Sequence, residues 1–159
     1  MDFKRLGIGA AVGLIALVLW LTWLWQPERQ VRLHTVGFLK AVEARKWSKV
    51  QSFLADSYSD RWGYDNEFVV AALEKAFQQF LFLSVEEKTT NSLASEGRAS
   101  SYVKISGQGG PIAQYVMTKV NSLGEPFTFT WAQRSGKPWD WHLLRVDHPS
   151  LDPGAEPQF

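Results

Sequence analysis

The chain opens on a segment that is apolar on every side. Residues 6–25 (LGIGAAVGLIALVLWLTWLW) carry no charge, and the only hydroxyl among them belongs to Thr22. As a helix, these twenty residues span roughly 30 Å, which is the thickness of a bilayer's hydrocarbon core. Trp20, Trp23 and Trp25 crowd the C-terminal end, where amphipathic rings favour the membrane interface. We therefore expect a single-pass transmembrane anchor over residues 1–26.

The charges on either side of this segment predict its orientation. Lys4 and Arg5 precede it, which favours a cytoplasmic N-terminus and places the rest of the chain outside the cytoplasmic (inner) membrane. The basic residues that follow it favour the opposite orientation: Arg29, Arg32, Lys40 and Arg45. A cleaved signal peptide is the alternative to an anchor, but its apolar core is only about 7–15 residues long. Gly9 and Gly13 have the GxxxG spacing that lets two helices approach closely, so a homo-oligomer is a further hypothesis.

After the anchor, apolar residues recur at helical spacing. The pattern predicts a long helix over residues 31–45 and a short helix over residues 48–56. Ser48 and Gln51 have the spacing of a capping box, so we expect Ser48 to begin the short helix. A third helix is predicted over residues 66–80, with Asp65 or Asn66 as its N-cap.

From residue 81 onward the apolar positions alternate, which is typical of strands. We expect strands over residues 81–90, 99–106, 112–120, 127–131 and 139–146, joined in order by short turns. The turns are predicted at residues 108–111 and 134–137. Short connections of this kind give an antiparallel sheet with one face open to the preceding helices. The folded domain is predicted over residues 27–149, and residues 150–159 as a disordered tail.

Two stretches of this sequence are similar to a known family. The helical stretch FLKAVEARKWSKVQSFLADSYS resembles the opening of NTF2-like domains of the SnoaL and ketosteroid-isomerase type, and RSGKPWDWHLLRVDH resembles their closing strand pair, with Trp141 as the strand's aromatic. The resemblance implies an α+β fold in which three helices pack on a curved antiparallel sheet of about four strands. A cystatin-like single helix on a sheet is the alternative. The superfamily includes enzymes, transport factors and secretion-system scaffolds, so the fold does not determine a function.

Composition excludes several classes of function. The 17 basic and 16 acidic residues leave a net charge of +1, which argues against a nucleic-acid partner. The chain has no cysteine, so disulfides and thiolate ligands are excluded. Its three histidines, His34, His142 and His148, lack the spacing of metal ligands, so we expect no metal and no cofactor.

Enzymes of the resembled superfamily place an Asp, His or Tyr inside the cone between helices and sheet. The side chains that could serve here are Asp56, Tyr58, Asp60, Tyr64, Tyr102, Tyr115, His142 and Asp147. We take His142, Tyr64 and Asp60 as weak catalytic candidates. Each also has a structural explanation, such as a capping or turn carboxylate for Asp60, so a catalyst is the less favoured hypothesis.

Aromatic residues favour binding over catalysis. By strand parity Phe127, Phe129 and Trp131 share one sheet face, and so do Trp139 and Trp141; if the helices leave that face uncovered, it is an interface. We therefore expect a membrane-anchored binding or assembly domain that contacts a second copy or a protein partner in a bacterial envelope. The alternative is a small-molecule site, enzymatic or not, in the cone pocket. A lipid-surface sensor that uses the basic first helix is a third hypothesis.

Overall fold

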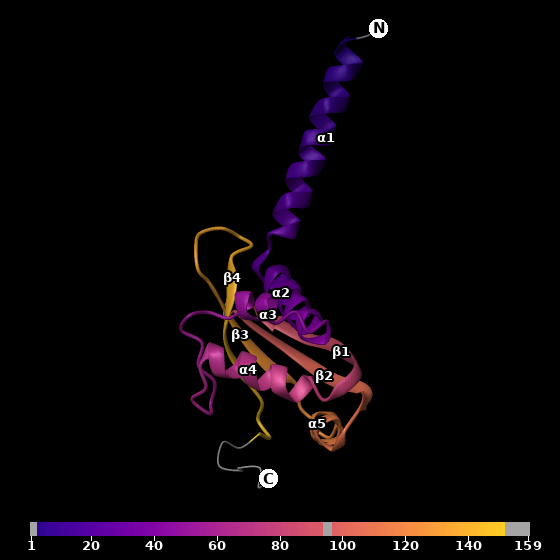
Figure 1. The fold of residues 1–159 in the computed structure, drawn as a ribbon. Coiled ribbons are helices and arrows are strands. Elements are labelled where there is room, and N and C mark those ends of the chain that lie inside the picture. The colour runs from indigo at the N-terminus through magenta and orange to yellow at the C-terminus, as the bar shows by residue number, and fades with distance from the viewer. Residues whose placement is uncertain (1–2, 94–96, 152–159) are drawn as a thin grey trace.

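The computed structural model describes residues 3–93 and 97–151 of the chain and has an α+β fold. Helices α1 (Phe3–Leu24), α2 (Pro27–Glu43), α3 (Trp47–Phe53) and α4 (Asn66–Phe77) precede strands β1 (Phe80–Leu93) and β2 (Arg98–Gly109). Helix α5 (Pro111–Asn121) follows, and strands β3 (Phe127–Gln133) and β4 (Trp141–Asp147) complete the order. Helices α2, α3 and α4 lie over one face of the sheet, while α1 projects away from it (Figure 1).

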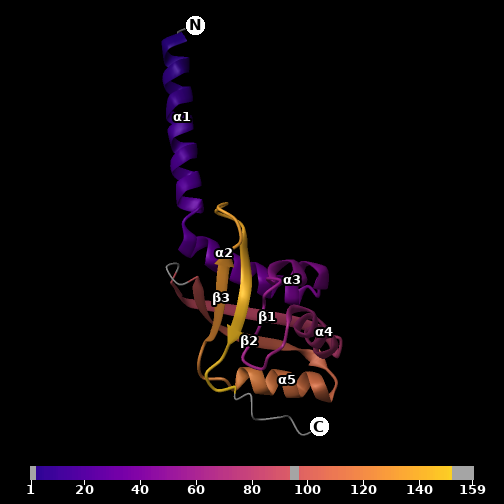
Figure 2. The same cartoon turned by 90° about the vertical axis from the view of Figure 1, so that its left-hand side faces the viewer.

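Helix α1 has no partner helix along its length in Figures 1 and 2. Its apolar side chains from Val12 to Trp23 are largely exposed; Leu14, for example, is 64% exposed. Within the described residues, no single helix has the length and hydropathy of a membrane span. The segments Ala11–Leu24 and Pro27–Glu43 have them only as a pair, bent by 66° at the break between them.

The predicted helices after the anchor are confirmed, with one error at a helix start. Asp65 caps α4, and its carboxylate accepts a hydrogen bond from the Phe68 amide at 2.9 Å. Ser48, however, is not the N-cap of α3: the helix begins at Trp47, Lys46 occupies the N-cap position, and no side chain caps it. The reason is that Arg45 adopts a left-handed φ of 53°, which reverses the chain directly after α2 and starts α3 one residue earlier.

The four strands form one antiparallel sheet in the order β1-β2-β3-β4. Strands β1 and β2 pair along nearly their whole length, from Phe80 opposite Gly109 to Leu93 opposite Arg98. Strand β3 pairs only with the first part of β2, from Arg98 to Ser101. The second half of β2 therefore has one edge that no strand covers, and α5 packs there.

The prediction of a strand at residues 112–120 is wrong, because this segment is helix α5. Ile112, Val116 and Val120 are even-numbered, as alternation requires, but they are also four residues apart and so share one helix face. Pro111 occupies the first turn of the helix, where its fixed φ is favourable. The predicted hairpin turn at residues 108–111 is consequently a strand-to-helix connection, with Gly110 as the N-cap of α5.

A side chain at the end of α5 provides hydrogen-bond partners for backbone groups on the open edge of β2. The Asn121 side-chain amide donates to the Ile105 carbonyl oxygen at 2.7 Å, and its oxygen accepts from the Ile105 amide at 2.8 Å. One side chain thus takes the place of a neighbouring strand at this position. Buried backbone groups need such partners.

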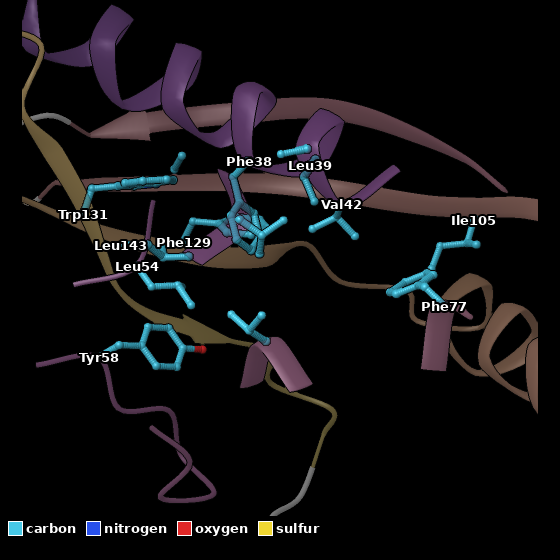
Figure 3. Close-up of a cluster of buried hydrophobic side chains, with 14 of the residues drawn as sticks. Phe38, Leu39, Val42, Leu54, Tyr58, Phe77, Ile105, Phe129, Trp131 and Leu143 are labelled. Carbon is cyan, nitrogen blue, oxygen red and sulfur yellow. The ribbon is translucent and has the colours of Figure 1, made fainter. Parts of the chain in front are cut away.

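The core lies between the inner face of the sheet and helices α2, α3 and α4. Figure 3 shows Trp131 at one end of this cluster and Phe77 with Ile105 at the other. Phe129 and Trp131 are 3% and 2% exposed, and Phe38 and Phe53 pack edge-on against them. The expected aromatic sheet face is therefore covered by the helices at these two positions.

The last strand starts later than predicted, and this separates two tryptophans. Strand β4 begins at Trp141, so Trp139 lies in the β3–β4 loop and does not share a strand face with it. The predicted tail is partly ordered at its start: the Ser150 hydroxyl donates to Glu125 at 2.8 Å, and the Leu151 amide donates to the His148 carbonyl oxygen. Residues 152–159 lie outside the described residues.

Candidate functional site

An apolar cavity of about 300 Å³ lies inside the cone, between α2, α4 and the inner face of the sheet. Its wall consists of valine, leucine, isoleucine and aromatic side chains with few polar groups. Val85 and Val103 come from β1 and β2, Phe127 and Phe129 from β3, and Leu39 and Val42 from α2. The titratable residues of the wall are Tyr58, Asp60, Asp147 and His148.

Tyr58 lies in the connection between α3 and α4 and is 4% exposed. Figure 3 shows its ring beside Leu54 and Leu143. Burial, followed by the negative charge of Asp60, raises the pKa of the Tyr58 phenol above its ordinary value of 10.0. The phenol is therefore neutral at physiological pH and acts as a hydrogen-bonding group rather than as a base.

Asp60 organises its own loop. One carboxylate oxygen accepts hydrogen bonds from the Trp62 amide at 2.9 Å and from the Tyr64 amide at 3.0 Å. Gly63 completes the turn with a positive φ of 77°, which glycine adopts without strain. This is the turn role that the sequence offers as the structural explanation of Asp60, although the residue also touches the cavity.

The other two titratable residues of the wall follow each other at the end of β4. Asp147 pairs with Arg145 at 2.7 Å. His148 is fully buried, and its Nδ1 accepts a hydrogen bond from the Ser150 amide at 3.1 Å. Its Nε2 must then carry the proton that it donates to the Glu125 carbonyl oxygen at 2.9 Å. Both ring nitrogens of His148 are occupied by the fold.

A second hollow of about 300 Å³ lies on the outer side of the sheet. His142 lines it together with Asp56, Ser57, Ala132 and Arg134. His142 faces outward because its neighbour Leu143 points into the core. Its Nε2 lies 3.1 Å from Asp140, whose pKa is lowered by hydrogen bonds from Ser135 and His142.

The catalytic candidates are thus not brought together. Asp60 is at the cavity, His142 is across the sheet from it, and Tyr64 is 42% exposed and stacks on Phe68 at 4.2 Å. Tyr102 and Tyr115 are also exposed. His148 was not among the candidates, and its position directly after a predicted strand gives no signal that its ring turns into the cone. In the described ranges, no group of three or more His, Asp or Glu side chains could hold a metal ion.

The aromatic residues expected to form a binding surface are divided between core, cavity and loop. Phe129 is in the core and the cavity wall, Trp131 is in the core, and Phe127 lines the cavity, where its ring lies 4.7 Å from that of His148. The Trp131 indole donates to the Thr35 hydroxyl at 2.9 Å, a buried polar pair. Trp141 is half-buried and donates to the Pro138 carbonyl oxygen at 2.8 Å, whereas Trp139 is 53% exposed.

No family model matches this chain, and no curated protein matches it. Solved structures do match it in fold. A conserved protein from Planctomyces limnophilus has a TM-score of 0.55 at 15% identity, over 75% of this chain and 91% of that one. A putative scytalone dehydratase from Novosphingobium aromaticivorans has a TM-score of 0.50 at 11% identity, over 74% and 79%.

A third match is longer than this chain. Bd1075 from Bdellovibrio bacteriovorus has a TM-score of 0.50 at 11% identity, covering 75% of this chain but only 39% of its own length. Together these likenesses show that the chain shares the α+β fold of these structures. At identities this low they show the fold alone, and a fold does not determine a function.

Proposed function

We propose that this chain is a membrane-tethered binding domain whose inner cavity holds a small apolar ligand. The cavity's composition is the observation that supports this function. A volume of about 300 Å³ with an almost wholly apolar wall is at the small end of the range of roughly 300–1,000 Å³ typical of ligand pockets. Apolar ligands gain free energy from leaving water for such a wall.

The polar groups on the wall favour binding over catalysis. A general acid or base has to be free to meet the ligand and has to exchange its proton near neutral pH. Here Asp60 accepts from two amides, Asp147 pairs with Arg145, and both nitrogens of His148 are hydrogen-bonded. The Tyr58 phenol has a hydrogen bond to the Val146 backbone, and its raised pKa keeps it neutral.

Filling the cavity tests this proposal. Val103→Phe and Val85→Phe put a ring into the cavity from β2 and β1, two strands that tolerate aromatic residues. Binding of N-phenyl-1-naphthylamine to the full chain in nanodiscs should be saturable for the unmodified protein and at least tenfold weaker in both variants. Partition of the probe into lipid is common to all samples and cancels in the comparison.

Ile112→Phe is the matched control, because Ile112 is 48% exposed on α5 and lies outside the cavity wall. It should bind the probe like the unmodified chain. Equal binding by all four proteins would show that the probe does not enter the cavity, and the proposal would then be wrong.

The tether is part of the proposal. Its support is the uncharged run of residues 6–25, which forms most of α1, together with the exposure of the apolar side chains from Val12 to Trp23. The charges before it favour a cytoplasmic N-terminus, so the domain is assigned to the outer side of the inner membrane. A phosphatase that works only outside the cytoplasm, fused after Phe159, should be active. Activity of a cytoplasm-only fluorescent reporter at the same position would reverse the orientation.

Assembly with a second copy or with an envelope protein is the second candidate function. The observation that favours it is the Gly9 and Gly13 face of α1, where an added Cβ meets nothing within 4 Å. Because the chain has no cysteine, Gly9→Cys and Gly13→Cys variants can be oxidised without a background reaction. A disulfide-linked dimer in membranes supports self-association. Monomers only, under oxidant that links a control dimer, contradict it.

A further inference from the structure

The junction between α1 and α2 is held by side-chain contacts. The Gln30 amide donates to the Leu24 carbonyl oxygen, the last residue of α1, at 2.8 Å. The Arg29 guanidinium lies over the Trp23 ring, 3.3 Å from its centroid, which is cation–π geometry. These contacts join the two helices at a defined bend of 66°.

The β3–β4 loop reaches the same junction from the other end of the sequence. Figures 1 and 2 show this loop rising beside the base of α1. The Trp139 ring lies 6.0 Å from the Trp25 ring. His34 bridges loop and helix: its Nε2 is 3.1 Å from the Trp139 carbonyl oxygen, and its Nδ1 is 2.8 Å from that of Gln30. The loop is therefore tied to the start of α2.

The exposed surface at this junction has the chemistry of a membrane interface. Trp20, Trp23 and Trp139 are 53%, 47% and 53% exposed. Indole rings favour the headgroup region because they combine an apolar body with one N–H donor. Basic side chains on the junction helix and in the loop can meet lipid phosphates, namely Arg29, Arg32 and Lys137.

The depth of Trp25 in the membrane favours the bilayer over another protein as the partner of Trp139. Trp25 follows the last residue of α1 directly, so in an anchored chain it lies at the level where the apolar helix leaves the hydrocarbon. Trp139 contacts Trp25 and must lie at nearly the same depth. We propose that the β3–β4 loop is a second membrane contact, which seats the domain on the lipid headgroups through Trp139. This inference rests on α1 being the proposed anchor.

The seating has a consequence for the cavity. Strand β4 runs from Trp141, beside the junction, to Asp147 at its other end, and the cavity wall includes Asp147, His148 and Leu151. The end of β4 that carries Asp147 lies away from α1 (Figure 1), so this part of the cavity wall is far from the anchor. A seated domain holds this end in the aqueous phase.

Three glycines offer a matched test. An added Cβ meets nothing within 4 Å at Gly13 in α1, at Gly136 in the β3–β4 loop and at Gly124 between α5 and β3, and the chain has no native cysteine. Each glycine is replaced by cysteine in the full chain and labelled with a nitroxide. The protein is reconstituted in vesicles of equal phosphatidylcholine and phosphatidylglycerol. Spin relaxation by oxygen and by a water-soluble nickel complex then gives the depth of each label.

If α1 is the anchor, the label at Gly13→Cys should have high oxygen and low nickel accessibility. The label at Gly124→Cys, at the end of the domain away from α1, should have the low oxygen and high nickel accessibility of a residue in water. If the β3–β4 loop contacts the headgroups, the label at Gly136→Cys should have an interfacial nickel accessibility. This accessibility should be at least threefold below that at Gly124→Cys. Adding Trp139→Ala should move the Gly136→Cys label to the aqueous value, whereas Trp139→Tyr should retain the interfacial one.

The outcomes separate the two proposals. A deep label at Gly13→Cys with an aqueous label at Gly136→Cys overturns the seating and leaves the anchor intact. An aqueous label at Gly13→Cys overturns the anchor, and the seating with it. An interfacial Gly136→Cys label that Trp139→Ala does not move overturns the role of Trp139.

Discussion

Two hollows of about 300 Å³ lie on opposite sides of the sheet, and they differ in almost everything except volume. The inner one is walled by apolar side chains, and its titratable groups are held by the fold. The outer one contains Arg134 and Asp56, whose side chains are 66% and 91% exposed and 3.9 Å apart. A loose, exposed ion pair of this kind contributes little free energy. Size therefore does not identify a binding site, whereas the walls do.

The difference between the walls of the two hollows is set by neighbouring residues of one strand. Leu143 and His142 are adjacent in β4 and point to opposite sides, as successive strand residues must. Leu143 is fully buried, whereas the His142 ring is hydrogen-bonded to Asp140, two residues before it. Catalytic chemistry placed at His142 would face the exposed hollow and not the apolar cavity. This is the argument for assigning ligand binding to the inner side.

The largest expected effect comes from this adjacent pair. Leu143→Ala should lower the free energy of unfolding by about 2–5 kcal/mol, because it opens a cavity in the packed core. His142→Ala should cost less than about 1 kcal/mol, the net value of one hydrogen bond. Guanidinium unfolding of the full chain in detergent, followed by the near-UV circular dichroism of its tryptophans, measures both. Equal losses would mean that the outer side of β4 is as tightly packed as the inner side.

The alternation that separates these two sides is readable from the sequence, and this explains how much of the fold could be predicted. Helices α2 and α4, the Asp65 cap and strands β1, β2 and β3 were predicted close to their observed positions. Helix α5 was not, because apolar residues four apart satisfy both a helix and an alternating strand. The pairing of Asn121 with the open edge of β2 favours the helix, and that contact is tertiary.

The candidate site could be predicted less well than the fold. Asp60, Tyr58 and Asp147 were among the possible polar residues of the cone, and they do reach its wall. The cavity itself depends on how far α2 and α4 stand from the sheet, which no sequence pattern specifies. His148 enters the wall because Ser150 and Glu125 turn its ring inward. Those two contacts come from backbone groups, whose positions residue types do not reveal.

A smaller effect is expected from a buried side-chain pair that crosses from α2 to the inner face of the sheet. Thr35 is fully buried, accepts from the Trp131 indole at 2.9 Å and donates to the Val31 carbonyl oxygen at 2.9 Å. Thr35→Val keeps the shape but leaves the indole N–H without an acceptor, at a cost of about 1–3 kcal/mol in the free energy of unfolding. The same guanidinium unfolding measures this loss.

Thr35→Ser is the control for this pair, because it keeps the hydroxyl and removes one methyl group, which is worth about 1 kcal/mol. The two variants should therefore differ in whether their cost depends on the Trp131→Phe background. Thr35→Val should cost less in that background, since the indole is gone, whereas Thr35→Ser should cost the same. A Thr35→Val loss that is unchanged by Trp131→Phe would show that the hydrogen bond contributes nothing.

The smallest effect is a pH dependence on the cavity side. The pKa of Tyr58 is raised in the folded chain, so its neutral form contributes stability in full below the unfolded value of 10.0. That contribution is lost as pH rises above about 10, because the unfolded phenol ionises while the folded one does not. The loss approaches but does not exceed about 1.4 kcal/mol for each pH unit. Unfolding free energies at pH 8 and pH 11, compared between the unmodified chain and Tyr58→Phe, measure it.

The comparison with Tyr58→Phe removes every titration that both chains share. The free energy of the unmodified chain should fall relative to that of the variant between pH 8 and pH 11. Asp60→Asn sharpens the interpretation, because the amide oxygen can still accept from Trp62 and Tyr64 while the charge that raises the phenol's pKa is gone. Burial is the larger cause, so Asp60→Asn should reduce the difference without abolishing it. If the difference in unfolding free energy between the unmodified chain and Tyr58→Phe does not change with pH, the phenol is in contact with water and Tyr58 is not part of the apolar wall.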